Sequence, residues 1–183
     1  KKGSIFGLLG PNGAGKSTLA ALIRDNFKSQ LPELVSIDGD EVRELFGKNL
    51  GFKEDDRYRQ IQRIQTFARM LDRQNMVVVV SALYAHPNLL EWNRENFSDY
   101  FEIYLEAPLE VVVERDPKGL YAKVARGEMK DVVGVDLPWH APLAPDLKIK
   151  MEPQGKAEEA FRQIVGAVPL LADLEERENA TAH

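Results

Sequence analysis

Short apolar runs alternate along this chain with longer segments in which apolar residues recur at helical spacing. The uninterrupted runs at Ser4–Leu9 and Met76–Ala82 predict buried strands, because a parallel strand that is covered on both faces is apolar throughout. Three further segments predict strands by their β-branched and aromatic residues: Leu34–Asp38, Phe101–Ala107 and Leu147–Met151. The pattern therefore predicts at least five strands.

Helices are expected between these strands. One should open near Lys16, and another should cover Glu54–Gln74, where apolar residues recur every three or four positions. Shorter helices are expected after Asp38 and Pro108, and the tail 155–183 should be helical with an interruption near Pro169. Strands that alternate with helices predict an α/β fold of three layers, with a central, mostly parallel sheet that binds ligands at the carboxyl ends of its strands.

Length and composition narrow the possible functions. At 183 residues without internal repeats, the chain is expected to form a single domain, 1–183. Lysine and arginine are scattered and the net charge is −5, which argues against a nucleic-acid or membrane partner. The absence of cysteine excludes disulfides and thiolate metal sites, and a cytoplasmic location is expected.

The stretch "GLLGPNGAGKSTLA" carries the pattern of a phosphate-binding loop. Gly10 is followed by four residues and then by Gly15, Lys16 and Ser17, between a predicted strand and a predicted helix. Backbone amides and Lys16 would bind the phosphates of ATP, and the Ser17 hydroxyl would bind Mg²⁺. In that context a chance match in a glycine-rich turn is disfavoured. The residues expected to bind ATP are Gly10, Asn12, Gly13, Ala14, Gly15, Lys16, Ser17 and Thr18.

A second stretch, "IDGDEVR", places two carboxylates at the end of the second strand. Asp38 and Asp40 would lie beside the phosphate loop, where phosphoryl transfer needs a metal and a group that takes the proton of the acceptor hydroxyl. Arg43 and Arg57 follow, and a guanidinium matches the geometry of phosphate or sulfate. The alternative, helix capping by Asp40 with solvated surface charges, is disfavoured because the carboxylates fall where this fold places its active site.

At this point the chain resembles the adenylylsulfate kinase family of phosphate-loop kinases. The resemblance covers "SIDGDEVR", "LGFKEDDRYRQIQRI" and "ERDPKGLYAKVARGEMKDVVGVDLPWHAP", and it extends from about Ser4 to Met151. It implies transfer of the γ-phosphate of ATP to the 3′-hydroxyl of adenosine 5′-phosphosulfate. It also implies a homodimer and a lid, around 116–136, that closes over the acceptor.

The resemblance assigns roles to individual positions. Asp38 would be the base, Asp40 would bind Mg²⁺ through water, and Lys16 would complete the catalytic set. Arg115 would lie near the donor nucleotide. The residues implied in binding the acceptor are Asp40, Arg43, Phe52, Arg57, Gln60, Ala82, Leu83, Lys118, Gly119, Leu120 and Val132.

Several positions depart from the family pattern. Gln60 replaces an asparagine, Tyr84 replaces a serine, and Ala82 and Val132 replace aromatic residues, so that only Phe52 remains of the clamp around the acceptor base. A different 5′-modified nucleotide, such as cytidine diphosphoramidate, is therefore an alternative acceptor. A regulatory module that binds nucleotide without turnover is a second alternative, disfavoured because the loop and both carboxylates are retained.

Overall fold

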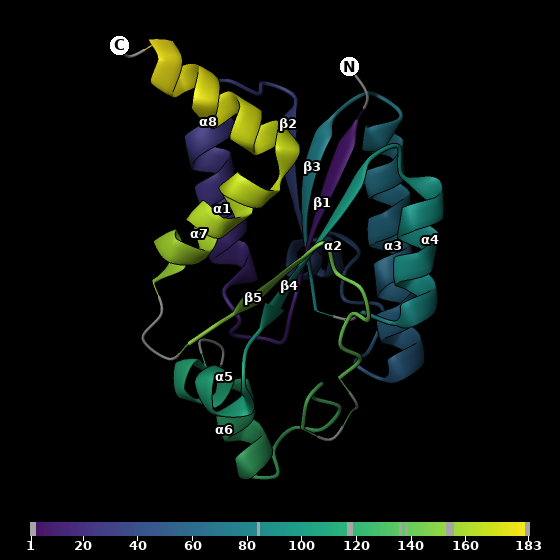
Figure 1. The fold of residues 1–183 in the computed structure, drawn as a ribbon. Coiled ribbons are helices and arrows are strands. Elements are labelled where there is room, and N and C mark those ends of the chain that lie inside the picture. The colour runs from purple at the N-terminus through teal and green to yellow at the C-terminus, as the bar shows by residue number, and fades with distance from the viewer. Residues whose placement is uncertain are drawn as a thin grey trace.

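The five strands form one parallel sheet in the order β2-β3-β1-β4-β5 (Figure 1). The structure is a computed structural model that describes residues 3–83, 85–116, 119–135, 137, 139–152 and 156–181. The strands are β1 (Ser4–Leu9), β2 (Leu34–Asp38), β3 (Val77–Ala82), β4 (Tyr100–Glu106) and β5 (Leu147–Lys150).

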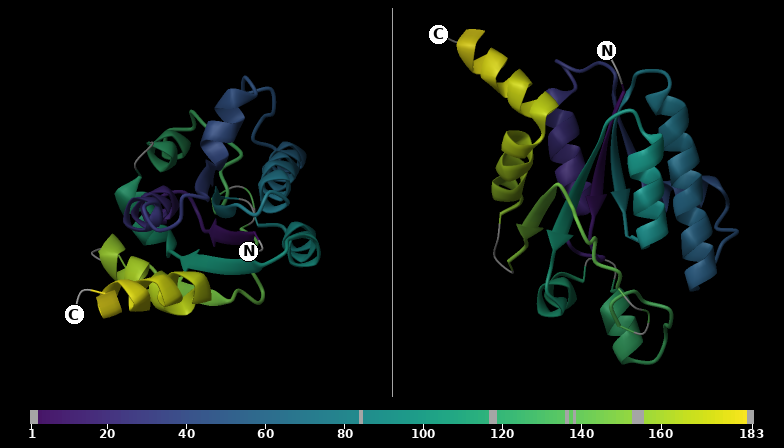
Figure 2. Two further views of the ribbon diagram at one scale, coloured as in Figure 1. Left: turned by 90° about the horizontal axis from the view of Figure 1, so that it is seen from above. Right: turned by 45° about the vertical axis from the view of Figure 1, so that its right-hand side comes forward.

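Helices connect the strands and cover both faces of the sheet. They are α1 (Lys16–Phe27), α2 (Gly39–Leu45), α3 (Glu54–Asp72), α4 (Pro87–Asn96), α5 (Leu109–Arg115), α6 (Leu120–Ala125), α7 (Ala157–Ala167) and α8 (Pro169–Thr181). Helices α1, α7 and α8 lie on one face and α3 and α4 on the other, and both views in Figure 2 show the sheet between these layers. The predicted three-layer α/β fold is confirmed. No helix among the described residues is long and apolar enough to span a bilayer.

The alternation of side chains along each strand produces two cores. On β1, Phe6 and Leu8 join the core under α1 and α7, whereas Ile5 and Leu9 join the core under α3. A strand that is buried on both faces has no polar face, which is why the central strands read as continuous apolar runs.

The predicted elements and the observed ones agree closely. β1 and β2 have the predicted bounds, whereas β3 begins one residue later than predicted and β4 is shifted by one residue toward the N-terminus. Two helices were not predicted, α4 and α6. They are short, and each buries a single side chain, Leu89 in α4 and Tyr121 in α6.

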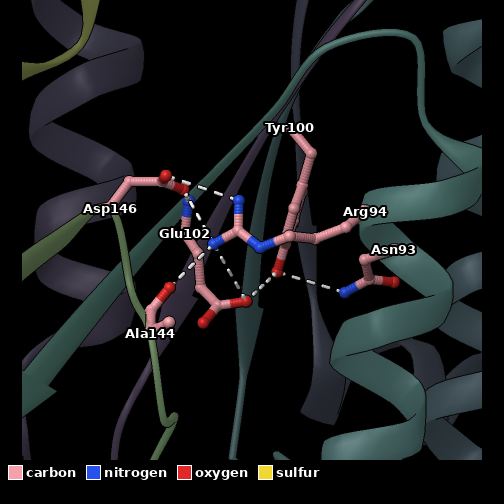
Figure 3. A network of polar contacts seen from close by, with 6 residues as sticks. All are labelled: Asn93, Arg94, Tyr100, Glu102, Ala144 and Asp146. Atoms are coloured by element: carbon pink, nitrogen blue, oxygen red, sulfur yellow. Dashed lines mark hydrogen bonds and ion pairs between the residues drawn. The ribbon is translucent and has the colours of Figure 1, made fainter.

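A network of polar contacts ties α4 to β4 and to the segment that leads into β5 (Figure 3). Glu102, which is 2% exposed, lies 3.8 Å from the Arg94 guanidinium and accepts a hydrogen bond from the Tyr100 hydroxyl at 3.2 Å. Asp146 accepts from the backbone N–H of Glu102 at 2.7 Å and pairs with Arg94 at 3.0 Å. The network thus holds the chain where it returns from the cavity region to the sheet.

Candidate active site

A cavity of about 780 Å³ lies at the carboxyl ends of β1, β2 and β3, where the fold was expected to bind its ligands. Its walls come from the loop after β1, from the segment after β2, from α3 and from the region of α5 and α6. Figure 1 shows α5 and α6 beyond the ends of the strands, on the side of the sheet toward which β4 points.

The loop after β1 has the geometry that phosphate binding requires. Gly15 is the residue before α1 and has a φ of 93°, a conformation that glycine adopts readily. Because glycine has no side chain to cap the helix, it leaves the first N–H groups of α1 available to a bound anion. A side chain at Gly10 would approach the carbonyl oxygen of Leu105 to 2.8 Å, which leaves no room for one. The Lys16 ammonium donates to the carbonyl oxygens of Gly10 and Pro11 at 2.7 and 2.8 Å. The loop therefore presents backbone donors and a cation to the cavity.

A single carboxylate joins this loop to the end of β2. Asp38 accepts a hydrogen bond from the Ser17 hydroxyl at 2.7 Å through Oδ2. Its Oδ1 accepts from the backbone N–H of Asp40 at 2.8 Å and so caps α2. Each carboxylate oxygen has a second lone pair, so both can still accept another proton donor.

The same atoms fit a magnesium ion bound together with phosphates. Mg²⁺ prefers hard oxygen ligands and usually keeps several waters, so one or two protein oxygens suffice. The Ser17 hydroxyl and the neighbouring carboxylates supply such oxygens. Within the part of the chain that the structure describes, no group of three or more His, Cys, Asp or Glu residues could hold a metal alone. The Ser17 and carboxylate oxygens suit a metal whose other ligands are waters and nucleotide phosphates.

Two guanidinium groups flank the exposed Phe52 ring. The Arg43 guanidinium lies 4.7 Å from the ring centroid and donates to the carbonyl oxygens of Leu50 and Gly51. Arg57 lies 5.5 Å from the same centroid and donates through Nε to the Phe52 carbonyl at 2.7 Å. Burial lowers the pKa of Arg43, and nearby Asp40 opposes this shift. This part of the cavity is cationic and has one aromatic face.

The wall beside these two arginines contains Gln60 and Ser81 among aliphatic side chains. The Gln60 amide nitrogen donates to the Gly39 carbonyl at 3.1 Å, whereas its carbonyl oxygen is buried without a hydrogen-bond partner among the described residues. Ala82 and Val132 also line the cavity, and both are buried. Where the family pattern has aromatic residues, this chain therefore presents small aliphatic side chains.

The segment expected to form a lid contacts both parts of the cavity. Asp116, directly after α5, accepts from the backbone N–H groups of Tyr121 and Ala122 in the first turn of α6. The Tyr121 hydroxyl donates to the Asn12 carbonyl of the phosphate loop at 3.3 Å, and burial raises the pKa of this phenol. On the other side, Arg57 Nη2 donates to the Asp131 carbonyl at 2.6 Å.

Most of the residues predicted from the sequence line this one cavity. They are Asn12, Gly13, Gly15, Lys16, Ser17, Thr18, Asp38, Asp40, Arg43, Phe52, Arg57, Gln60, Ala82, Leu83, Arg115, Leu120 and Val132. Gly10, Ala14 and Gly119 are not among its lining residues, because Gly10 and Ala14 lie in the buried part of the loop and Gly119 precedes α6. Lys118 and Tyr84 lie outside the described residues.

Sequence reasoning missed several residues that line the cavity, including Ser81, Asp116, Tyr121, Met129 and Met151. Asp116 and Tyr121 belong to the "RDPKGLY" stretch that carried the resemblance. The two methionines carried no comparable signal.

Comparisons with known proteins agree with this geometry. The family model for adenylylsulphate kinase matches residues 2–150. A probable adenylyl-sulfate kinase of Pyrococcus abyssi (strain GE5 / Orsay) is 34% identical over 165 residues, which cover 88% of this chain and 95% of the relative. An adenylyl-sulfate kinase of Myxococcus xanthus (strain DK1622) is 38% identical over 151 residues, with 80% and 81% of the two chains covered.

A solved structure of similar fold extends the comparison. The APS kinase of Mycobacterium tuberculosis in complex with AMPPNP and APS superimposes with a TM-score of 0.82 at 28% sequence identity. The superposition covers 91% of this chain and 98% of that chain. The chain therefore belongs to the adenylylsulphate kinase family, whose members are phosphotransferases with an alcohol group as acceptor.

Proposed function

We propose that this protein transfers the γ-phosphate of ATP to the 3′-hydroxyl of adenosine 5′-phosphosulfate. The relatives named as adenylyl-sulfate kinases support this proposal, as does the similar structure that was solved with AMPPNP and APS. The observation that carries it is the hydrogen bond from Ser17 to Asp38, which joins the phosphate loop to a strand-end carboxylate inside a cavity with two arginines.

The proposed reaction uses the loop to hold ATP and the carboxylate to move a proton. Backbone amides of the loop and Lys16 bind the β- and γ-phosphates. Asp38 takes the proton of the 3′-hydroxyl, whose oxygen then bonds to the γ-phosphorus while the bond from that phosphorus to the ADP oxygen breaks. We assign Mg²⁺ to Ser17, with Asp40 acting through water; when bound, Mg²⁺ would neutralise phosphate charge.

The acceptor is proposed to lie between α2 and α3. Arg43 and Arg57 bind its anionic 5′ group, because a guanidinium pairs with phosphate or sulfate oxygens in bidentate fashion. Phe52 provides a face for its base. The remaining acceptor contacts are proposed for Gln60, Ala82, Leu83, Val132 and the lid residues Lys118, Gly119 and Leu120, with Arg115 near the donor nucleotide.

One observation supports a second acceptor. Ala82 and Val132 are both small and aliphatic, and each has less than a tenth of its surface exposed, so neither can stack on a base as an aromatic ring would. Loss of a stacking partner costs about 1–3 kcal/mol per base in other nucleotide-binding proteins. A different 5′-modified nucleotide, such as cytidine diphosphoramidate, would depend less on such stacking. From the family we further propose a homodimer in the cytoplasm.

Release of ADP from Mg-ATP, measured with each acceptor separately and without acceptor, tests the proposal. Turnover and a 3′-phosphorylated product with adenosine 5′-phosphosulfate would support it, turnover only with the cytidine compound would establish the second acceptor, and no turnover with either would contradict both. Asp38→Asn should lower turnover about 10²- to 10⁴-fold while ATP binding is retained. A regulatory module without turnover would be insensitive to this change.

A further inference from the structure

One guanidinium connects the acceptor side of the cavity to the lid. Arg57 is only 7% exposed and lines the cavity from α3. Its Nε donates to the carbonyl oxygen of Phe52, and its Nη2 donates to the carbonyl oxygen of Asp131, 74 positions further along the chain. At 2.7 and 2.6 Å these are short hydrogen bonds from a charged donor, which are stronger than bonds between neutral groups. The side chain therefore fixes the position of two separate backbone segments.

The backbone conformation of Asp131 directs its carbonyl oxygen toward this arginine. Asp131 has a φ of 63°, in the left-handed region that residues other than glycine, asparagine and aspartate rarely adopt. A tight turn follows at once, in which the Val132 carbonyl accepts from the N–H groups of both Val135 and Leu137. Val132 is itself buried and lines the cavity. The bond from Arg57 thus holds the part of the lid that forms one wall of the cavity.

We propose that Arg57 couples binding of the acceptor to closure of the lid. This inference rests on the proposed function, in which the same guanidinium binds the anionic 5′ group of the acceptor. An anion on the guanidinium fixes the orientation of its plane and so holds Nη2 against the Asp131 carbonyl. Coupling of two equilibria is reciprocal: if the acceptor favours the closed lid by some factor, the closed lid favours the acceptor by the same factor. Weakening the contact should therefore open the lid and raise the KM for the acceptor together.

The contact can be weakened without touching the arginine. Asp131→Val places a β-branched residue at a positive φ, which disfavours the observed conformation by about tenfold, or 1.4 kcal/mol. Asp131→Asn and Asp131→Gly are the matched controls: both remove the carboxylate, and both tolerate the left-handed conformation. Arg57→Lys is a second test, since one ammonium group cannot reproduce the two directed bonds of the guanidinium.

Trypsin cleavage reports lid opening without any need for activity. Lys123, Arg126 and Lys130 are exposed residues of the lid, and cleavage at such sites requires local opening of the backbone. We expect cleavage after these residues to be about tenfold faster in Asp131→Val than in Asp131→Asn, which equally lacks the carboxylate, and faster in Arg57→Lys than in the wild type. Adenosine 5′-phosphosulfate with Mg-ADP should slow cleavage of the wild type and of both controls.

Steady-state kinetics provides the second measurement. We expect the KM for adenosine 5′-phosphosulfate to be about tenfold higher in Asp131→Val than in Asp131→Asn, and the KM for ATP to be the same in both. Equal cleavage rates and equal acceptor KM values for the valine and asparagine variants would overturn the inference. A wild type that turns over no acceptor would refute the proposed function instead, and cleavage without ligand would still decide whether Arg57 holds the lid.

Discussion

Asp146→Ala should lower the free energy of unfolding by about 1–2 kcal/mol, although Asp146 lies outside the cavity. Its Oδ2 accepts the backbone N–H of Glu102 at 2.7 Å, in the middle of the network shown in Figure 3. Glu102 is 2% exposed, whereas Asp146 lies at the surface, so water can replace part but not all of the lost acceptor. A buried N–H group left without a partner costs about 1–3 kcal/mol, and this is the larger part of the expected loss.

The ion pair of Asp146 contributes the smaller part. Arg94 Nη2 lies 3.0 Å from the Asp146 carboxylate, but the two side chains are 38% and 32% exposed. Solvent screening at such exposure limits a pair of this kind to about 0–1 kcal/mol. Arg94 also keeps its hydrogen bond to the Ala144 carbonyl and its contact with Glu102 after the substitution.

Urea unfolding followed by far-UV circular dichroism at pH 7 measures this loss, provided that the dependence on urea concentration has the same slope in each variant. Asp146→Asn is the matched control, because it removes the charge and keeps an oxygen that can accept from the Glu102 N–H. We expect it to lose about 1 kcal/mol or less. If the alanine and asparagine variants lose the same free energy, the hydrogen bond to the Glu102 backbone is not the source of the stability.

Two further predictions concern Glu102 and Ala82. Burial raises the pKa of Glu102 above 4.5, so its contribution to stability is complete below that pH and is lost as pH rises through the raised value. In Glu102→Gln the free energy of unfolding should therefore fall less steeply with pH above pH 4.5 than it does in the wild type. Urea unfolding at several pH values would measure this, and an equal fall in the variant and the wild type would contradict the prediction. Ala82→Phe should lower the KM for adenosine 5′-phosphosulfate about 5- to 150-fold without changing the KM for ATP, because stacking on a base is worth about 1–3 kcal/mol. The neighbouring void of about 30 Å³ cannot hold a phenyl ring, so the ring must enter the main cavity. Initial rates at varied acceptor concentration would measure the KM values, and an unchanged or higher KM would contradict stacking.

The sequence predicted β1 and β3 because both are buried on both faces and are apolar throughout. It predicted β2 from its β-branched residues, although only Leu34 and Ile37 of that strand are buried. Ser4–Leu9 is a continuous apolar run ended by the glycine of the phosphate loop, and Leu34–Asp38 ends at the glycine that opens α2. The ends of β3 and β4 were predicted less well. Pairing sets these ends: β4 pairs along Tyr100–Tyr104 with β1, so Tyr100 joins the strand although its ring packs beside Gly7 at the sheet surface.

The sequence predicted the site residues that belong to short local motifs. It did not predict the contacts between residues that lie far apart along the chain. Ser17 and Asp38 belong to short stretches whose spacing indicates phosphate and metal binding, and the structure brings them within 2.7 Å. No local pattern could predict that Arg57 donates to the Asp131 carbonyl, since any residue type offers the same oxygen. Only the left-handed conformation at Asp131 distinguishes that position, and an aspartate there is a weak signal of it.

The phosphate loop and the acceptor wall of the cavity therefore differ in how much amino-acid substitution they tolerate. The phosphate loop is held by main-chain geometry, such as the φ of Gly15 and the contact of Gly10 with the Leu105 carbonyl, so substitutions there disturb the backbone and the core beneath it. The acceptor wall instead consists of side chains. Phe52 is 44% exposed, and Ala82 borders a void that already tolerates imperfect packing. A change of acceptor would then cost little stability, whereas a change of phosphate donor would require a different loop. Specificity for the acceptor is for this reason the property in which this chain can differ most from its relatives.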